Sequence, residues 1–457
     1  MMKPCVRIFF VLSNLLIAQS SHPVDMDSRY LMTTERLEKI RSQQDVHAIR
    51  KHAWELFLGI NQNVQADFPF PLNRVPVWLT WNTKEEVFQG RTENFFERLH
   101  TLDQFLIFAQ EEMITNRELK SLHSIDTSQI PLSTIFLNPP TANRLRTATP
   151  VPGLPGVFVK PIDPKSIETA DAEFTRRGIE GAAREIAPFP DNSLAVKTAW
   201  YLVSSTVWRA NQIPVWHGPP SVSASTDALK PNQWPDHVRI DPRHARYACP
   251  RVDTTCEGLE KPDIVEPSSA VAKLPIVPVD NLFYVPVCTC DQAKAINSKF
   301  GNLYGAFPGD FIVLMGLHLT TREIPDWVWA TFWWSDRTLG NPFLKDRPLF
   351  YPSPWNHYLM DATLDMVTPQ DAQKHPKAIY NPWLEVVTMP LDKAITSNCM
   401  NCHRTSVFPR VHFPAPGSID PAGQLLRGKT KLDFLWTIGS QFDPPTNPKG
   451  VDSSRKP

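Results

Sequence analysis

Hydrophobic residues recur at helical spacing in the first part of the chain, residues 21 to about 125. The clearest stripe has Asp45 in front of it as a possible N-cap, and it consists of Ile49, Ala53, Leu56, Phe57 and Ile60. A second stripe consists of Phe95, Phe96, Leu99, Leu102 and Leu106. Both stripes predict amphipathic helices that turn one face to the core.

Prolines interrupt the pattern between residues 126 and 195. Pro139 and Pro140 are adjacent, and a second cluster runs from Pro150 to Pro155. Proline removes a backbone donor and fixes the local dihedral angle, so this segment is expected to connect or wrap rather than to form long elements.

The region from 196 to 345 changes to a strand pattern. The apolar run 311–320 is followed by the aromatic run 327–334, with a proline-containing connection between them, which predicts a β-hairpin or adjacent strands. Strict alternation would give one face to Ile312, Leu314, Gly316 and His318, and the other face to Val313, Met315 and Leu317. On the first face, Gly316 would leave room for a flat ring.

The remaining chain is expected to be rich in loops. Residues 346–440 contain a predicted short helix from Leu432 to Ile438, capped by Thr430 with Asp433 in the reciprocal position. Residues 441–457 are predicted to form a flexible tail. The fold class that follows is α+β, with a helical N-terminal portion, an antiparallel β core and a loop-rich C-terminal segment.

The N-terminus has the pattern of a secretory signal peptide. Lys3 and Arg7 precede an apolar run from Ile8 to Ala18, and small residues follow at a possible cleavage point. The run is shorter than the roughly 20 residues of a membrane-spanning helix. We therefore expect residues 1–20 to be removed and the protein to be periplasmic or secreted, with a retained N-terminal anchor as the alternative and no other membrane span.

Charge and composition narrow the classes of partner. The 457 residues contain 47 Lys and Arg against 47 Asp and Glu, so the formal net charge is zero. Nucleic acid and anionic membranes attract proteins with a clustered basic excess, so no nucleic-acid partner is expected. Hydrophobic residues make up 42% of the chain, which is enough to exclude a disordered protein.

One motif carries specific chemistry. Cys399, Cys402 and His403 form C-x-x-C-H, the sequence of c-type haem attachment. Two thiols at this spacing can bond the two vinyl groups of one porphyrin, and the adjacent histidine can then bind the iron. With 7 Cys and 13 His in 457 residues, chance gives the motif only about 0.003 times per chain. We expect one covalent haem c per chain; a disulfide or half of a zinc site is the alternative.

Four further cysteines are expected to form two disulfides in an oxidising compartment. A bond between Cys288 and Cys290 would close a strained small ring, so both are predicted to pair with Cys249 and Cys256, in an order left open. A metal site with four thiolates is the alternative.

His403 is the predicted proximal iron ligand, and a second axial ligand is sought upstream. The 54 residues after His403 contain one histidine, His412, and no methionine. The upstream candidates are His318, Met315, His357, Met360, Met366 and Met389. We favour His318 because of its apolar, aromatic surroundings; a hydrogen-bonded core histidine is the alternative. Arg322, Arg337 and Arg404 are candidate partners for haem propionates.

Several sequence blocks occur in an order that resembles a family of exported bacterial proteins described as cytochrome c family proteins, which carry one C-x-x-C-H near the C-terminus. The blocks are Ala53–Phe57, Trp78–Trp81, Ala195–Trp200, Gly316–His318, Trp329–Phe332 and Asn401–His403. The resemblance spans most of the mature chain and implies that His318 and the haem segment belong to one unit. It implies no substrate.

Two functions are consistent with these features. The first is a single-haem c-type cytochrome in electron transfer or another redox role, with a redox protein as partner. The second is a haem-dependent oxidoreductase, peroxidase-like or oxygenase-like, with an open distal iron site and a small-molecule substrate.

Overall fold

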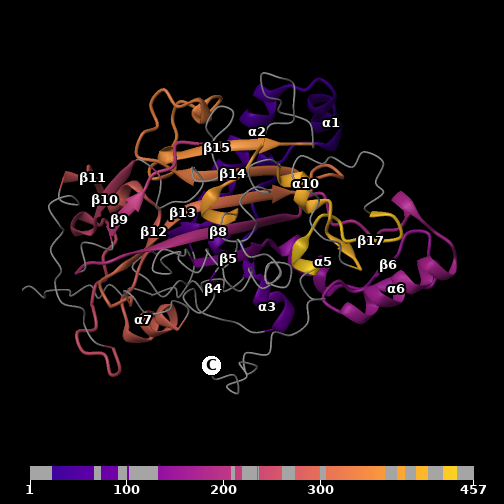
Figure 1. Ribbon diagram of the computed structural model, residues 1–457, viewed down its shortest axis with the longest axis horizontal. Helices are drawn as coiled ribbons and strands as arrows, with labels where there is room; N and C mark the ends of the chain where they lie inside the picture. Colours follow the sequence, from indigo (N-terminus) through magenta and orange to yellow (C-terminus); the bar gives the residue numbers. More distant parts are fainter. Residues whose placement is uncertain are drawn as a thin grey trace, which may run out of the picture.

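An eight-stranded sheet forms the centre of the structure, a computed structural model (Figure 1). Its main path has the order β15-β14-β13-β8-β5-β3, while β12 pairs with β13 and β4 with β5, and each pair is antiparallel. The structure describes residues 23–65, 74–90, 100–101, 132–206, 211–218, 234, 236–259, 273–298, 305–365, 378–385, 398–409 and 426–439.

The strands of this sheet come from distant parts of the chain. They are β3 (Asn82–Thr83), β4 (His100–Thr101), β5 (Leu132–Leu137), β8 (Leu194–Val203), β12 (Tyr284–Pro286), β13 (Phe311–Thr321), β14 (Val328–Trp334) and β15 (Tyr358–Thr363). The small sheets contain β1 (Asn63–Gln65), β2 (Arg74–Pro76), β6 (Thr149–Pro150), β7 (Phe158–Val159), β9 (Gln212–Pro214), β10 (His237–Asp241), β11 (Ile276–Pro278), β16 (Val407–Phe408) and β17 (Thr430–Lys431). The α+β class and the antiparallel core are thus confirmed, and the main sheet also uses strands from outside residues 196–345.

Helices and short 3₁₀ turns surround the sheet. The α-helices are α1 (Thr34–Ser42), α2 (Val46–Ile60), α3 (Lys84–Gln89), α5 (Pro139–Arg146), α6 (Pro164–Arg176), α7 (Cys290–Asn297), α8 (Pro382–Glu385), α10 (Cys399–His403) and α11 (Trp436–Gly439). The 3₁₀ helices are Ser28–Tyr30, Val77–Thr80, Gly181–Ala183, Pro242–His244, Val279–Asn281, Pro342–Leu344 and Trp355–His357.

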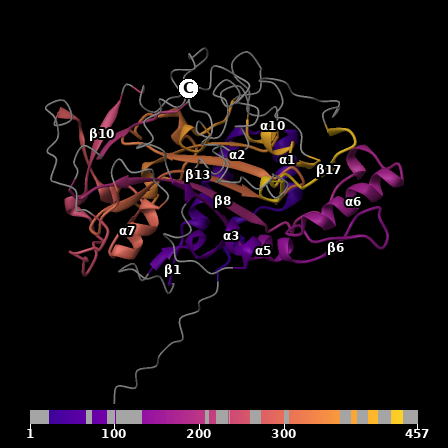
Figure 2. The same cartoon turned by 60° about the horizontal axis from the view of Figure 1, so that its bottom comes forward.

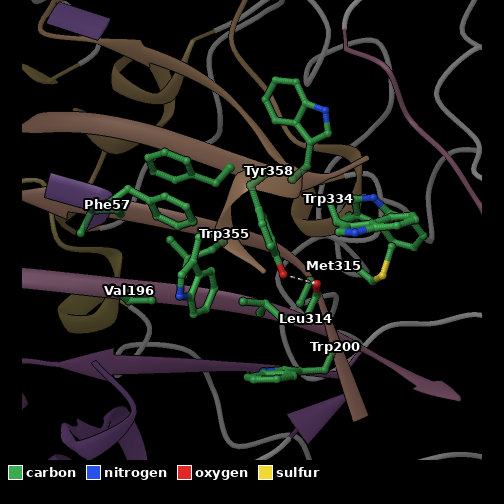
Figure 3. Packing of buried hydrophobic residues seen from close by; sticks show 14 of the residues in the cluster. Phe57, Val196, Trp200, Leu314, Met315, Trp334, Trp355 and Tyr358 are labelled. Atoms are coloured by element: carbon green, nitrogen blue, oxygen red, sulfur yellow. Dashed lines mark hydrogen bonds between the residues drawn. The ribbon is translucent and has the colours of Figure 1, made fainter. Parts of the chain in front are cut away.

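Helix α2 covers one face of the sheet, as the first hydrophobic stripe predicts. The Asp45 carboxylate accepts from the backbone N–H of Ala48 at 3.0 Å and caps the helix. On the apolar side, the Phe57 ring stacks on Phe332 of β14 at 3.9 Å between centroids. Figure 3 shows the aromatic packing in this core, where the Tyr358 hydroxyl donates to the Leu314 carbonyl at 2.8 Å.

A bulge in β13 corrects the expected alternation. The pairing of β13 with β8 joins Leu314 to Trp200 and Gly316 to Ala199, so Met315 is an extra residue between them. Since residues opposite each other share a face, Leu314 and Gly316 lie on opposite faces. The predicted grouping of Ile312 and Leu314 with Gly316 and His318 is therefore wrong, because one bulged residue inverts the order on one side of it.

The opposite face of the sheet is covered by the C-terminal segments. Asn381, just before α8, donates to Thr331 Oγ1 at 3.0 Å and to the Phe332 carbonyl at 2.9 Å. A second hydrophobic cluster joins Trp329 of β14 with Met400 of α10 and with Leu432 and Leu435 near β17. Figure 2 shows α10 and β17 near the end of β13, with α6 beyond them.

The C-terminal helix differs from its prediction. Thr430 lies in β17, and Asp433 and Phe434 have φ angles of 48° and 64°, so the chain makes a turn there instead of a helix. Helix α11 begins only at Trp436. Left-handed backbone at two consecutive non-glycine residues has no clear sequence signature, which is why the helical pattern was misleading.

Both disulfides pair the cysteines across the two clusters, which confirms the prediction and supplies the order. Cys249 bonds Cys288, and Cys256 bonds Cys290. All four sulfurs are therefore used, and the alternative of a four-thiolate metal site is wrong.

Some expectations fall on residues that the structure does not describe. These are the signal peptide at 1–20, the second helical stripe at 95–106 apart from His100 and Thr101, and the tail at 441–457. Within the described part of the chain, no helix has the length and apolar character needed to cross a membrane.

Candidate haem site

The C-x-x-C-H motif forms the short helix α10. Cys399 and His403 stand at its two ends, four residues apart, so their side chains project from one side of a helical turn. Between them, Met400 is 3% exposed and packs into the second hydrophobic cluster. Cys402 lies within the same helix. The burial of Met400 fixes the helix against the sheet and leaves Cys399 half-buried at its start.

His403 has a defined orientation. Its Nδ1 lies 2.9 Å from the carbonyl oxygen of Phe434. A carbonyl only accepts, so Nδ1 carries the proton and Nε2 keeps its lone pair. The imidazole also lies against the indole of Trp329, with 4.1 Å between ring centroids.

Burial keeps this imidazole neutral. Desolvation lowers the pKa of His403 to about 3, the hydrogen bond to Phe434 acts in the opposite direction, and the nearby charges of His318 and Lys197 lower the pKa further. A neutral imidazole with a free lone pair on Nε2 is the form that binds a metal. A ring nitrogen bonded to a carbonyl is the usual outer support of such a ligand.

His318 lies near His403, on the same face of the sheet as Trp329. In β13 it is opposite Lys197 of β8 and Thr331 of β14. Its Nε2 is 3.4 Å from Glu385 Oε1 of α8, and 22% of its side chain is exposed. The structure thus brings together His318 and the motif histidine, which are 85 positions apart in the sequence.

Lys197 adds a cation beside His318. Desolvation lowers the pKa of Lys197 to about 8, while the Glu385 carboxylate raises it. Lys197, His318 and Glu385 therefore form a polar group that three different elements bring to an otherwise largely apolar face. No local pattern in the sequence indicates Lys197 or Glu385, because their proximity depends on strand pairing and on the position of α8.

The space above Gly316 is filled by protein. A Cβ atom at Gly316 would lie 2.9 Å from Asn381 Nδ2 and 3.2 Å from Trp383 Cβ. The expected approach of a flat ring to Gly316 is therefore wrong. The missing side chain instead lets the segment before α8 lie directly on the sheet.

The other upstream ligand candidates have different surroundings. Met315 and Met360 are 0% exposed and belong to the main hydrophobic cluster. His357 has a pKa lowered by burial, and the charges that act on it are Arg347 and Asp336. Met366 and Met389 lie outside the described residues. Among the described candidates, His318 is the one whose charge acts on His403.

Two candidate arginines lie close to carboxylates. Arg322 lies 3.2 Å from Asp191 and 3.6 Å from Asp433. Arg337 lies 3.5 Å from Asp236 and 3.7 Å from Asp336. These ion pairs account for Arg322 and Arg337 without a propionate. The third candidate, Arg404, is half-buried immediately after the motif.

The residues around α10 fit a covalently bound haem. Cys399 is half-buried at the start of the helix and packs against the second hydrophobic cluster, and His403 is held through Nδ1, so that its Nε2 is the nitrogen that could bind iron. Across the described ranges, no group of three or more His, Cys, Asp or Glu side chains is arranged to hold a metal ion by itself. A porphyrin supplies four ligands of its own and needs only axial groups from the protein.

Comparison with protein-family models gives no match, and comparisons with curated proteins and with solved structures give none. Two groups that sequence reasoning missed are the Phe434 carbonyl and the Asp433 carboxylate. The carbonyl leaves no trace in the sequence because any residue can supply one, and Asp433 is expected only as the reciprocal residue of a helix cap.

Proposed function

We propose that the chain is an exported, single-haem c-type cytochrome that acts in electron transfer or another redox role. Haem c is attached through Cys399 and Cys402, and His403 is the proximal ligand. The observation that carries the proposal is the hydrogen bond from His403 Nδ1 to the Phe434 carbonyl, which leaves Nε2 free within a C-x-x-C-H helix. The resemblance to exported cytochrome c family proteins and the two disulfides support an oxidising compartment, periplasmic or extracellular.

His318 is the proposed second axial ligand. Its proximity to His403 supports this role, as does its position on a face bordered by Trp329 and Thr331. When bound, haem c supplies a one-electron couple whose potential depends on axial ligands and burial. The chain itself holds His403 neutral, packs Trp329 against its ring and buries Met400 in the adjacent cluster, and the charge of His318 is close enough to lower the pKa of His403.

The alternative is a haem-dependent oxidoreductase with an open distal position. The contact of His318 with Glu385 favours it, because a histidine paired with a carboxylate is suited to proton transfer. Lys197 would then provide a cation for an anionic or polar small substrate.

Covalent attachment is tested on protein made in a host that matures c-type cytochromes. After denaturation and acid–acetone extraction, haem should remain on the wild-type polypeptide. Cys402→Ser should weaken or abolish this attachment. The matched control is the double variant Cys256→Ser, Cys290→Ser, which removes a cysteine pair outside the motif and should keep its haem. Free extraction of haem from the wild type would contradict the proposal.

The two functions differ in the response of the ferrous protein to carbon monoxide. A low-spin spectrum that carbon monoxide does not change supports two axial protein ligands. Rapid binding supports the open site. His318→Ala should convert the first behaviour to the second, whereas an unchanged spectrum would exclude His318 as a ligand.

A further inference from the structure

The turn after β17 has an unusual backbone. The Leu435 N–H donates to the Leu432 carbonyl at 3.2 Å, and the two central residues, Asp433 and Phe434, both have positive φ. This is the signature of a type I′ turn, which ordinarily uses Asn or Gly. Left-handed backbone at an aromatic residue costs free energy and persists only where the surroundings enforce it.

The turn directs one backbone carbonyl at His403. Because Phe434 is left-handed, its carbonyl oxygen reaches the His403 Nδ1 at 2.9 Å. Trp329 contacts the same imidazole ring. The turn thus provides the acceptor that determines which nitrogen of His403 is protonated.

The side chain of Asp433 holds this turn in place. Its Oδ2 accepts from the Phe189 N–H at 2.7 Å, and its Oδ1 accepts from the Trp327 indole N–H at 3.3 Å. The Arg322 guanidinium lies 3.6 Å from Oδ2. These three partners come from two segments, the connection between β13 and β14 and the loop around Phe189, and neither segment contains the turn.

One of the partners is itself in an unusual conformation. Trp327 has a φ of 62°, and its ring is completely buried. The Trp327 indole donates to Asp433, and the next residue, Phe434, accepts from His403. Three non-glycine residues with left-handed backbone therefore form one connected group that ends at His403. Such strain is expected where a structure holds a functional group in a fixed position.

We infer that Asp433 is a positioning residue for the haem ligand: by anchoring the turn to Trp327 and Phe189, it holds the Phe434 carbonyl against His403 Nδ1. The inference rests on the proposed function, since it assigns the purpose of the turn to His403 as a ligand. A carbonyl acceptor on Nδ1 strengthens the electron donation of the opposite nitrogen. Asp433 would therefore lower the reduction potential of the bound haem without touching it.

The test compares two variants of the full haem-loaded protein. Asp433→Gly removes the anchoring carboxylate, and the glycine that replaces it tolerates positive φ. Glu185→Gln removes a carboxylate whose charge acts on Asp433 but which holds no atom of the turn, and so controls for the change in charge. The readouts are the reduction potential and the exchange rate of the His403 Nδ1 proton, followed by NMR.

For Asp433→Gly we expect Nδ1 proton exchange to accelerate roughly tenfold and the potential to shift upward by more than in Glu185→Gln. The control should exchange at the wild-type rate. If Asp433→Gly does not fold, Asp433→Asn decides, since Asn tolerates left-handed backbone but cannot accept from both Phe189 and Trp327 as a carboxylate does.

Wild-type proton exchange in the Asp433 variant would overturn the inference while leaving covalent haem attachment intact. A potential shift no larger than that of Glu185→Gln would do the same, since charge alone would explain it. A wild-type protein without covalent haem would instead overturn the proposed function, and the inference with it. The two failures are therefore distinguishable by the extraction test.

Discussion

His403 gains its chemical character from groups that are distant in the sequence. The Phe434 carbonyl accepts a hydrogen bond from its Nδ1, Trp329 covers the ring, and burial lowers its pKa to about 3. The motif alone predicts the ligand, but neither its tautomer nor its neutrality. Those properties arise when β14 and the turn after β17 bring their residues to α10.

At the scale of a single residue, Lys197 provides a test of how burial affects a charged side chain. Its pKa of about 8 in the fold lies below its ordinary value of 10.5 because burial disfavours the charged form. Between these two values the unfolded chain holds a proton that the folded chain lacks, so stability rises with pH across this window. Below pH 8 Lys197 is protonated in both the folded and the unfolded state, and the folded state bears the full free-energy cost of burying its charge.

We therefore expect Lys197→Met to increase the free energy of unfolding by about 2 to 3 kcal/mol at pH 7. The gain should shrink as the pH rises from 8 to 10.5, as measured by urea unfolding at several pH values. Lys51→Met, at an exposed position of α2, is the matched control and should change little. A gain that does not vary with pH would contradict the assignment to desolvation.

At the scale of elements, the sequence predicts the helices and strands whose patterns lie within a short stretch of the chain. The stripe from Ile49 to Ile60 with its cap at Asp45 corresponds to α2, and the runs after 311 and 327 form an antiparallel hairpin. The cross-pairing of cysteines also follows from local geometry. For α2 and the hairpin, neighbouring residues contain the whole signal, whereas for the cysteines the local signal is only the short spacing of Cys288 and Cys290, which excludes their bonding to each other.

The failures arise where tertiary contacts override a local pattern. The bulge at Met315 inverts the faces of β13, and no residue in the run marks it. The turn at Asp433 replaces a predicted helix because Phe189 and Trp327 bind its carboxylate. The room at Gly316 is real, but Asn381 fills it.

The N-cap of α2 gives a prediction at this scale. Asp45→Ala removes the acceptor for the Ala48 N–H and should lower the free energy of unfolding by about 1 kcal/mol. Asp45→Asn retains an acceptor oxygen and should remain within a few tenths of a kcal/mol of wild type. Thermal unfolding followed by circular dichroism distinguishes the two. Equal loss in both variants would indicate that charge, rather than capping, stabilises the helix.

At the scale of the whole molecule, long-range contacts join the N-terminal helices to the central hairpin. The Glu323 carboxylate, 2% exposed, accepts from His52 Nε2 of α2 at 3.0 Å and also from the Met32 N–H. The C-terminal segment around α10 has its own two-stranded sheet of β16 and β17, and the bridge between Glu185 and Lys431 joins it to the rest of the chain. The predicted ligand pair therefore depends on the assembly of the entire chain.

The disulfides stabilise a part of the molecule with its own small sheet. Cys249–Cys288 closes a separation of 39 residues. Replacing both cysteines with serine should cost about 2 to 4 kcal/mol of unfolding free energy, measured with guanidinium, because a long loop is released in the unfolded chain. Haem attachment should be unaffected, since neither cysteine belongs to the motif. Loss of haem in this variant would show that the disulfide is needed to form the site.

The central claim is that Cys399, Cys402 and His403 hold one haem in an exported chain. Intact-mass spectrometry of mature protein from a host competent in cytochrome c maturation tests this claim most directly. We expect the mass of the polypeptide without residues 1–20, plus one haem and less four hydrogen atoms for the two disulfides. A mass that corresponds to an unmodified polypeptide would contradict the account.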